Sequence, residues 1–76
     1  MNTGEKREIL NGQAIRLARL RLGLTQAELA KLAEIDPSNL NKAEHRNVGI
    51  GARKLPGLAA ALGTTVDALV NLKQAA

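Results

Sequence analysis

Five polar side chains cluster between positions 38 and 45, and their spacing would place most of them on one face of a helix. They are Ser38, Asn39, Asn41, Lys42 and His45. Positions 38, 41, 42 and 45 are three or four residues apart and so share one outer face, with position 39 at its N-terminal edge. Hydroxyl and amide groups both donate and accept hydrogen bonds, and Lys42 adds a positive charge. Such a face suits recognition of a polar partner, although on an arbitrary helix it is usually a solvated surface.

The same residues give little support to catalysis or to metal binding. The chain has one histidine, one serine and neither cysteine nor tyrosine. His45 has no second ligand at metal-binding spacing, and Ser38 has no neighbouring base that could activate it. No aromatic residue is present, which argues against binding of single-stranded nucleic acid by base stacking. We therefore expect a protein that is not an enzyme and needs no cofactor or metal.

Two helix-start signals frame the elements that must position this polar face. Thr25 with Glu28 forms a capping box, in which each side chain accepts from the other residue's backbone N–H. Asp36 is a good N-cap, and Pro37 suits the first position of a helix because its missing N–H had no partner there. We expect helices over residues 26–33 and 37–45, joined by a short turn as in a helix-turn-helix.

The rest of the chain predicts three more short helices. A helix over residues 12–22 should end at Gly23 and bury Ile15, Ala18 and Leu22. Another should begin near residue 54 and end at residue 62, with Pro56 in its first turn. Thr65 should cap the last helix. The predicted fold is a compact all-α bundle of about five helices over residues 12–72, with an N-terminal arm (residues 1–11) and a C-terminal tail (residues 73–76).

Composition narrows the class of partner. The chain has 76 residues, a formal net charge of +4 and a pI near 10.1, which favour an acidic partner such as nucleic acid. No apolar run approaches the roughly 18 residues of a membrane span, and no signal peptide is evident. We therefore expect a cytoplasmic protein that does not bind membranes. No small-molecule effector is evident.

The helix signals and several matching residues resemble the helix-turn-helix of the lambdoid phage repressor and Cro family. Controller proteins of restriction–modification systems share this motif. The matching positions are Arg19, residues 23–30, Leu40 and Glu44, together with residues 55–63 and 66–69. The resemblance implies a lambda-repressor-like domain that binds double-stranded DNA sequence-specifically and regulates transcription, as a repressor would. An antitoxin-like or controller-like autoregulator and a protein-interaction module without DNA binding are the alternatives.

The resemblance also implies roles for individual residues. Base contacts fall at Pro37, Ser38 and Lys42, with Asn39 and Asn41 as further donors and acceptors on the second helix of the motif. Gln26 matches the glutamine that clamps a phosphate in this family. Other expected contacts to the DNA backbone are Thr25, Arg46, Asn47 and Arg53. Arg19 and Glu44 should form a partly buried salt bridge. Glu34 and Pro37 depart from the glycine and glutamine that the family commonly has there.

Surplus apolar residues suggest a second interface. Leu17 and Leu20 form a stripe outside the Ile15 face of the first helix, and Val70 and Leu72 make the last helix apolar on more than one side. The stripe is covered either by the N-terminal arm or a neighbouring helix, or by a partner. Because a chain this short has a marginal core, we expect a homodimer, and the family resemblance implies that it binds a pseudo-palindromic site.

Overall fold

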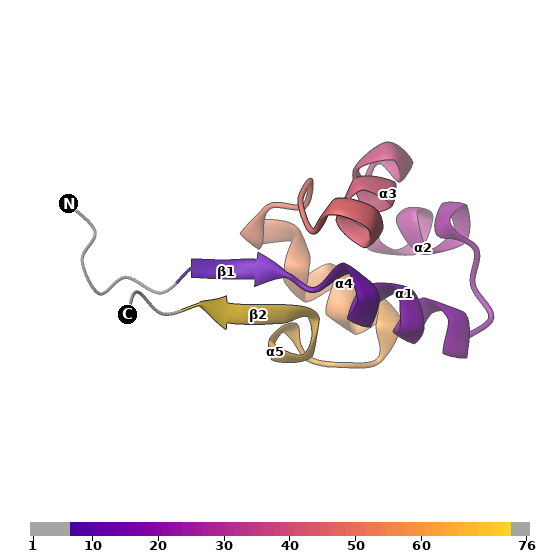
Figure 1. Ribbon diagram of the computed structural model, residues 1–76. Helices are drawn as coiled ribbons and strands as arrows, with labels where there is room; N and C mark the ends of the chain where they lie inside the picture. Colours follow the sequence, from indigo (N-terminus) through magenta and orange to yellow (C-terminus); the bar gives the residue numbers. More distant parts are fainter. Residues whose placement is uncertain (1–6, 74–76) are drawn as a thin grey trace.

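Five α-helices and a short two-stranded ribbon make up the computed structural model, which describes residues 7–73 (Figure 1). The helices are α1 (Gly12–Arg21), α2 (Gln26–Ala33), α3 (Pro37–Arg46), α4 (Leu55–Leu62) and α5 (Val66–Leu69). A 3-10 turn (Ala52–Lys54) precedes α4. Strands β1 (Arg7–Leu10) and β2 (Val70–Lys73) flank the helices in sequence. The predicted all-α bundle of five short helices is confirmed, and the ribbon is an addition to it.

The predicted capping residues start the helices of the helix-turn-helix. Thr25 Oγ1 accepts from the Glu28 backbone N–H at 3.0 Å, and Glu28 Oε1 accepts from the Thr25 N–H at 2.8 Å. Asp36 Oδ1 accepts from the Ser38 N–H at 2.8 Å, with Pro37 at the first helical position. The α2 range agrees with the prediction, and α3 extends one residue further, to Arg46.

A residue with left-handed backbone conformation follows α1, and residues of the same conformation end α2 and α3. Gly23 follows α1 with φ of 70°, and Asn47 ends α3 with φ of 62°. Glu34 ends α2 with φ of 57°, a conformation that costs a residue with a Cβ about 1–2 kcal/mol. The turn therefore keeps its left-handed geometry even though a glutamate occupies the position.

Aliphatic side chains from every helix and from the base of the ribbon form one core. Ile15, Leu29, Leu40, Leu58 and Leu69 are its largest fully buried members. The prediction for Leu22 was wrong. This residue lies at the C-cap of α1 and is 52% exposed.

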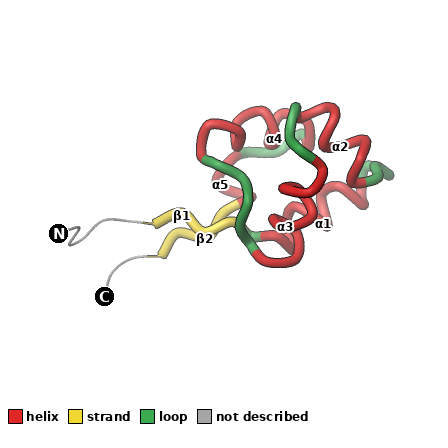
Figure 2. Tube along the Cα trace, turned by 90° about the horizontal axis from the view of Figure 1, so that it is seen from above, coloured by secondary structure: helices red, strands yellow, loops and turns green. Residues whose placement is uncertain are grey.

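The ribbon corrects the prediction for the last helix and for part of the arm. Helix α5 ends at Leu69, and Val70 has extended φ and ψ of −131° and 155°. The chain then pairs antiparallel with β1, with Arg7 opposite Lys73 and Leu10 opposite Val70. The ribbon projects away from the helices and brings both ends of the described chain to one side (Figures 1 and 2). Residues 1–6 of the predicted arm and 74–76 of the tail lie outside the described residues.

No helix in residues 7–73 is long and apolar enough to cross a membrane.

Candidate nucleic-acid interface

Helix α3 separates its two faces as the sequence predicts. Leu40, Ala43 and Glu44 are buried, whereas the outer positions Ser38, Asn41, Lys42 and His45 are exposed. Asn39 is half-buried, and Pro37 is exposed at the start of the helix. Figure 1 shows α3 beside α2 at one side of the molecule, away from the strands and from α5. The polar side chains therefore form an exposed ridge that a partner can reach.

The N-terminal end of α3 is held by hydrogen bonds to Asp36. Ser38 Oγ donates to Asp36 Oδ1 at 2.7 Å, and the Ser38 backbone N–H donates to the same oxygen at 2.8 Å. These two bonds lower the pKa of Asp36 below its ordinary value. Because its hydrogen is engaged, the Ser38 hydroxyl faces a partner mainly as an acceptor.

A polar chain runs from the interior to this ridge. Arg19 Nε donates to Glu44 Oε2 at 2.8 Å, and Arg19 Nη2 donates to Glu44 Oε1 at 3.0 Å. Gln26 Nε2 also donates to Glu44 Oε1, at 3.0 Å. Asn41 Nδ2 donates to Gln26 Oε1 at 3.1 Å. The structure thus contains the expected Arg19–Glu44 ion pair and connects it, through the start of α2, to an exposed residue of α3.

The ion pair is buried and charged. The Glu44 side chain is fully buried, and the Arg19 side chain is 10% exposed. Burial by itself raises the pKa of Glu44, but hydrogen bonds from Arg19 and Gln26, with the charge of Arg19, together lower it below the ordinary value. Arg19 also donates through Nη1 to the Leu24 carbonyl oxygen at 2.8 Å. One guanidinium therefore ties α1 both to α3 and to the segment before α2.

Of the other residues expected to contact phosphates, two form hydrogen bonds within the protein and two are exposed arginines. Thr25 uses its hydroxyl oxygen in the capping box. Asn47 Oδ1 accepts from the Gly12 backbone N–H at 2.8 Å. Arg46, in the last turn of α3, and Arg53, in the 3-10 turn, are both exposed. No hydrogen bond within the described residues connects Arg53 with α3, so its expected role depends on how a partner lies.

Gly49 helps to shape the candidate interface, and the sequence alone did not indicate this role. Its φ is 104°, and a Cβ there would lie 3.0 Å from the Asn39 carbonyl oxygen and 3.2 Å from Lys42 Cβ. The glycine therefore lets the loop after α3 approach the helix beside Lys42. The signal was the glycine-containing loop, but its partner on α3 was not readable from local sequence.

The candidate dimer residues divide into two groups. Leu17 and Leu20 are 46% and 49% exposed, so within the described residues neither a neighbouring helix nor the arm covers them. Val70 is only 7% exposed and packs into the core from β2, so its prediction as a dimer-surface residue was wrong. The backbone of Leu72 pairs with Glu8 in the ribbon. The side chain of Leu72 is not among those that the structure describes.

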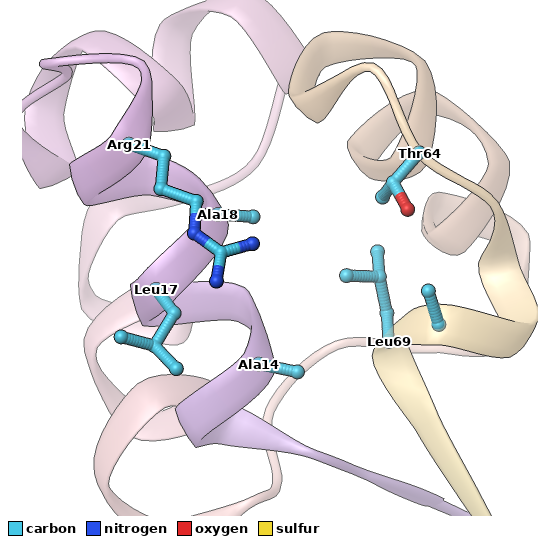
Figure 3. Close-up of a pocket in the computed structure, with 7 residues that line it drawn as sticks. Ala14, Leu17, Ala18, Arg21, Thr64 and Leu69 are labelled. Carbon is cyan, nitrogen blue, oxygen red and sulfur yellow. The ribbon is translucent and has the colours of Figure 1, made fainter.

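A hollow between α1 and α5 adjoins Leu17. It has a volume of about 210 Å³ and an apolar lining, with the guanidinium of Arg21 directed toward it from α1 and Thr64 on the opposite side (Figure 3). Its remaining lining residues are Ala14, Ala18, Ala68 and Leu69. The lining comes from two segments more than 40 residues apart in sequence, so no local pattern indicates the hollow. Among the described residues, no group of three His, Cys, Asp or Glu side chains could hold a metal ion.

Comparisons with known proteins agree with this geometry. The helix-turn-helix family model HTH_3 matches residues 15–69. The restriction–modification controller protein C.AhdI from Aeromonas hydrophila is similar with a TM-score of 0.69 and 30% identity, over 75% of this chain and 86% of that one. SinR, the master regulator for biofilm formation solved in complex with DNA, has a TM-score of 0.69 and 28% identity, over 75% of this chain and 95% of that one.

A third structure extends further along the chain. The hypothetical transcription factor NHTF from Neisseria has a TM-score of 0.68 and 25% identity and covers 93% of this chain and 90% of that one. No curated protein matches in the sequence comparison. The family match spans well over half of the residues and includes the capped α2–α3 motif. The chain therefore belongs to the XRE-type helix-turn-helix family of DNA-binding transcriptional regulators.

Proposed function

We propose that this protein binds duplex DNA sequence-specifically as a homodimer, with α3 in the major groove, and represses transcription. The observation that carries the proposal is the exposed polar ridge of α3, whose opposite face is buried in the core. In helix-turn-helix proteins the second helix of the motif enters the major groove, and its N-terminal residues meet the base edges. The chain's formal net charge of +4 suits a polyanionic partner.

Direct base contacts would come from the exposed residues of α3. Lys42 can donate to guanine O6 or N7, and Ser38 offers its hydroxyl oxygen as an acceptor. Pro37 has no polar side chain and suits only an apolar contact, such as a thymine methyl group. Asn39 is half-buried beside Gly49 and would contact a base only at the edge of the groove.

Backbone contacts would flank the ridge. The first residues of α2 present N–H groups that have no intrahelical partner, and such a helix N-terminus attracts a phosphate. Gln26 retains a second amide hydrogen for this purpose, and Arg46 lies exposed in the last turn of α3. Thr25, Asn47 and Arg53 would add contacts through whichever groups the fold leaves available.

The homodimer would use the apolar surface of α1 rather than β2. Leu17 and Leu20 are the exposed leucines of this surface, and the hollow beside Leu17 can receive an apolar side chain from a second copy. None of these residues belongs to α2 or α3, so the ridge stays available. A two-fold dimer of this kind reads two half-sites about 34–36 Å apart.

The test is selection of binding sites from random duplexes, followed by titrations at several salt concentrations. We expect an enriched pseudo-palindrome and an affinity that falls by orders of magnitude between 50 and 200 mM salt. Lys42→Met should cost about 1–3 kcal/mol and relax the preference at one base position. No enrichment, or binding that does not respond to salt, would exclude the proposal and favour a protein-interaction module.

Controller-like autoregulation is the second candidate function. It is favoured by the similarity to C.AhdI, of which 86% is covered at 30% identity. The enriched sequence distinguishes the two. A controller-like autoregulator should find its best site next to its own coding sequence, and a reporter placed behind that site should respond to the protein.

A further inference from the structure

We propose that the buried Arg19–Glu44 pair, acting through Gln26, orients the amide of Asn41 so that this residue reads a base carrying an exocyclic amino group. Adenine and cytosine carry such a group in the major groove. The inference rests on the proposed DNA-binding function, and it assigns a base preference to one residue and a positioning role to another.

The first link is the carboxylate of Glu44. Its side chain is fully buried and receives three hydrogen bonds, two from Arg19 and one from Gln26. An ionised carboxylate has no hydrogen to give and can only accept. Gln26 must therefore turn its NH₂ group, rather than its carbonyl oxygen, toward Glu44. The direction of the amide follows from the charge of the pair.

The second link carries the same direction to the surface. With the Gln26 amide nitrogen on Glu44 at 3.0 Å, the carbonyl oxygen of Gln26 faces Asn41. A carbonyl oxygen accepts only, so Asn41 must present its own NH₂ group, and the distance from Nδ2 to Gln26 Oε1 is 3.1 Å. The Asn41 amide is thereby held in one of its two orientations.

Asn41 therefore presents its hydrogen-bond acceptor and donor at the ridge in a fixed arrangement. Asn41 is exposed, and its Oδ1 has no hydrogen-bond partner among residues 7–73. This oxygen accepts from adenine N6 or cytosine N4, whereas guanine O6 and thymine O4 are themselves acceptors and would repel it. The second hydrogen of Nδ2 remains available to adenine N7. An asparagine free to rotate would not discriminate in this way.

Gln26 thus has a positioning role in addition to the phosphate contact proposed above, and the two roles affect different measurements. Loss of a clamp weakens all DNA sites alike, because phosphate contacts carry no sequence information. Loss of a positioning residue instead relaxes the preference at the one base pair that Asn41 contacts. The two roles therefore predict different outcomes for the same substitution.

The experiment compares base preferences of variants by selection and by titration of four duplexes that differ at one base pair. Asn41→Ala identifies that base pair as the one whose preference disappears. There, the wild type should favour adenine or cytosine by about tenfold, a usual cost of a mismatched base pair. Gln26→Met should reduce this ratio to about threefold or less and leave the base preferences at the other positions unchanged. Gln13→Met, an exposed residue of α1, is the matched control and should change nothing.

A second variant keeps the test informative if Gln26→Met loses stability, which a thermal unfolding curve would show. Asn41→Asp presents only acceptors, so it should retain the adenine or cytosine preference at lower affinity, with or without Gln26. A wild-type preference for guanine or thymine at this base pair, or an unchanged preference in folded Gln26→Met, would overturn the inference.

A measurement without DNA separates this inference from the proposed function. In NMR spectra of the free protein, the side-chain NH₂ of Asn41 should show slowed hydrogen exchange that is lost in Gln26→Met. If the slowed exchange is present but selection enriches no sequence, sequence-specific binding fails, and the base preference fails with it, while the orientation by Gln26 stands. If an operator is enriched but the Asn41 amide exchanges as freely as in Gln26→Met, the positioning role is wrong and DNA binding stands.

Discussion

The Asn47 side chain accepts a 2.8 Å hydrogen bond from the backbone N–H of Gly12, so the end of α3 caps the start of α1. The two helices meet closely at this point. A Cβ on Gly12 would lie 2.2 Å from the Ala43 carbonyl oxygen and 2.6 Å from that of Glu44. Backbone atoms cannot rotate away as a side chain can, and therefore any larger residue must push α1 away from α3.

Gly12→Ala should accordingly destabilise the domain, by about 1–3 kcal/mol or more, as overpacking does. Urea unfolding followed by circular dichroism measures the loss. Gly57→Ala in α4 is the matched control, because its Cβ would meet nothing closer than 3.8 Å. This control should be neutral or stabilise by up to about 1 kcal/mol, the usual difference in helix propensity. Equal effects of the two substitutions would contradict the close contact.

Replacing one member of the Arg19–Glu44 pair should lower the free energy of unfolding more than replacing both. Arg19→Met or Glu44→Met alone leaves an uncompensated buried charge, at a cost of about 3–5 kcal/mol. The double variant leaves no unpaired charge and should be more stable than either single variant. A double-mutant cycle of unfolding free energies tests this, and strictly additive losses would show that the two charges do not compensate each other.

The same pair predicts how stability depends on pH. The pKa of Glu44 is lower in the folded chain than its ordinary value. At pH values near and between these two pKa values, the folded state therefore binds fewer protons than the unfolded state. Stability from Glu44 is therefore complete above the ordinary pKa of glutamate, about 4.3, and is lost as the pH falls through the lower folded value.

Unfolding free energies measured between pH 7 and pH 2.5 should thus decrease below about pH 4.5. Asp36, whose pKa is also lowered, contributes in the same direction. The decrease should be shallower in the double variant Arg19→Met with Glu44→Met, which keeps Asp36. An identical acid profile for wild type and double variant would assign the effect to other carboxylates.

Glu34→Gly should stabilise the helix-turn-helix. Glu34 has φ of 57°, and a glycine adopts this conformation without the steric cost of a Cβ. We expect a gain of up to about 1 kcal/mol in unfolding free energy. Glu34→Ala keeps the Cβ and serves as the control for loss of the carboxylate. A glycine variant no more stable than the alanine variant would mean that the turn stores little strain.

The apolar surface of α1 predicts the behaviour of the dimer. Replacing both Leu17 and Leu20 with serine should shift sedimentation from dimer to monomer at micromolar concentration and weaken DNA binding without loss of helix content. Leu32→Ser is a matched control, because Leu32 is 61% exposed on α2, outside this surface. A wild type that sediments as a strict monomer, with and without DNA, would remove the basis for this prediction.

The sequence alone determined most of the helix boundaries. Thr25 with Glu28, and Asp36 with Pro37, define their helix starts through contacts within three residues. Asn47 likewise ends its helix through its own backbone conformation. Signals of this kind are local, and therefore a short window of residues contains all the physical information. The division of α3 into a buried and an exposed face also follows from helical periodicity.

Only the tertiary structure decided which groups meet across the chain. Gln26 and Asn41 are 15 residues apart, and Gly12 and Asn47 are 35 residues apart. The β1–β2 ribbon joins segments about 60 residues apart and turns the predicted end of α5 into a strand that buries Val70. The free energy of such contacts depends on how whole helices pack. The intrinsic propensity of a single residue does not contain this free energy, so such contacts can be identified only once the tertiary structure is known.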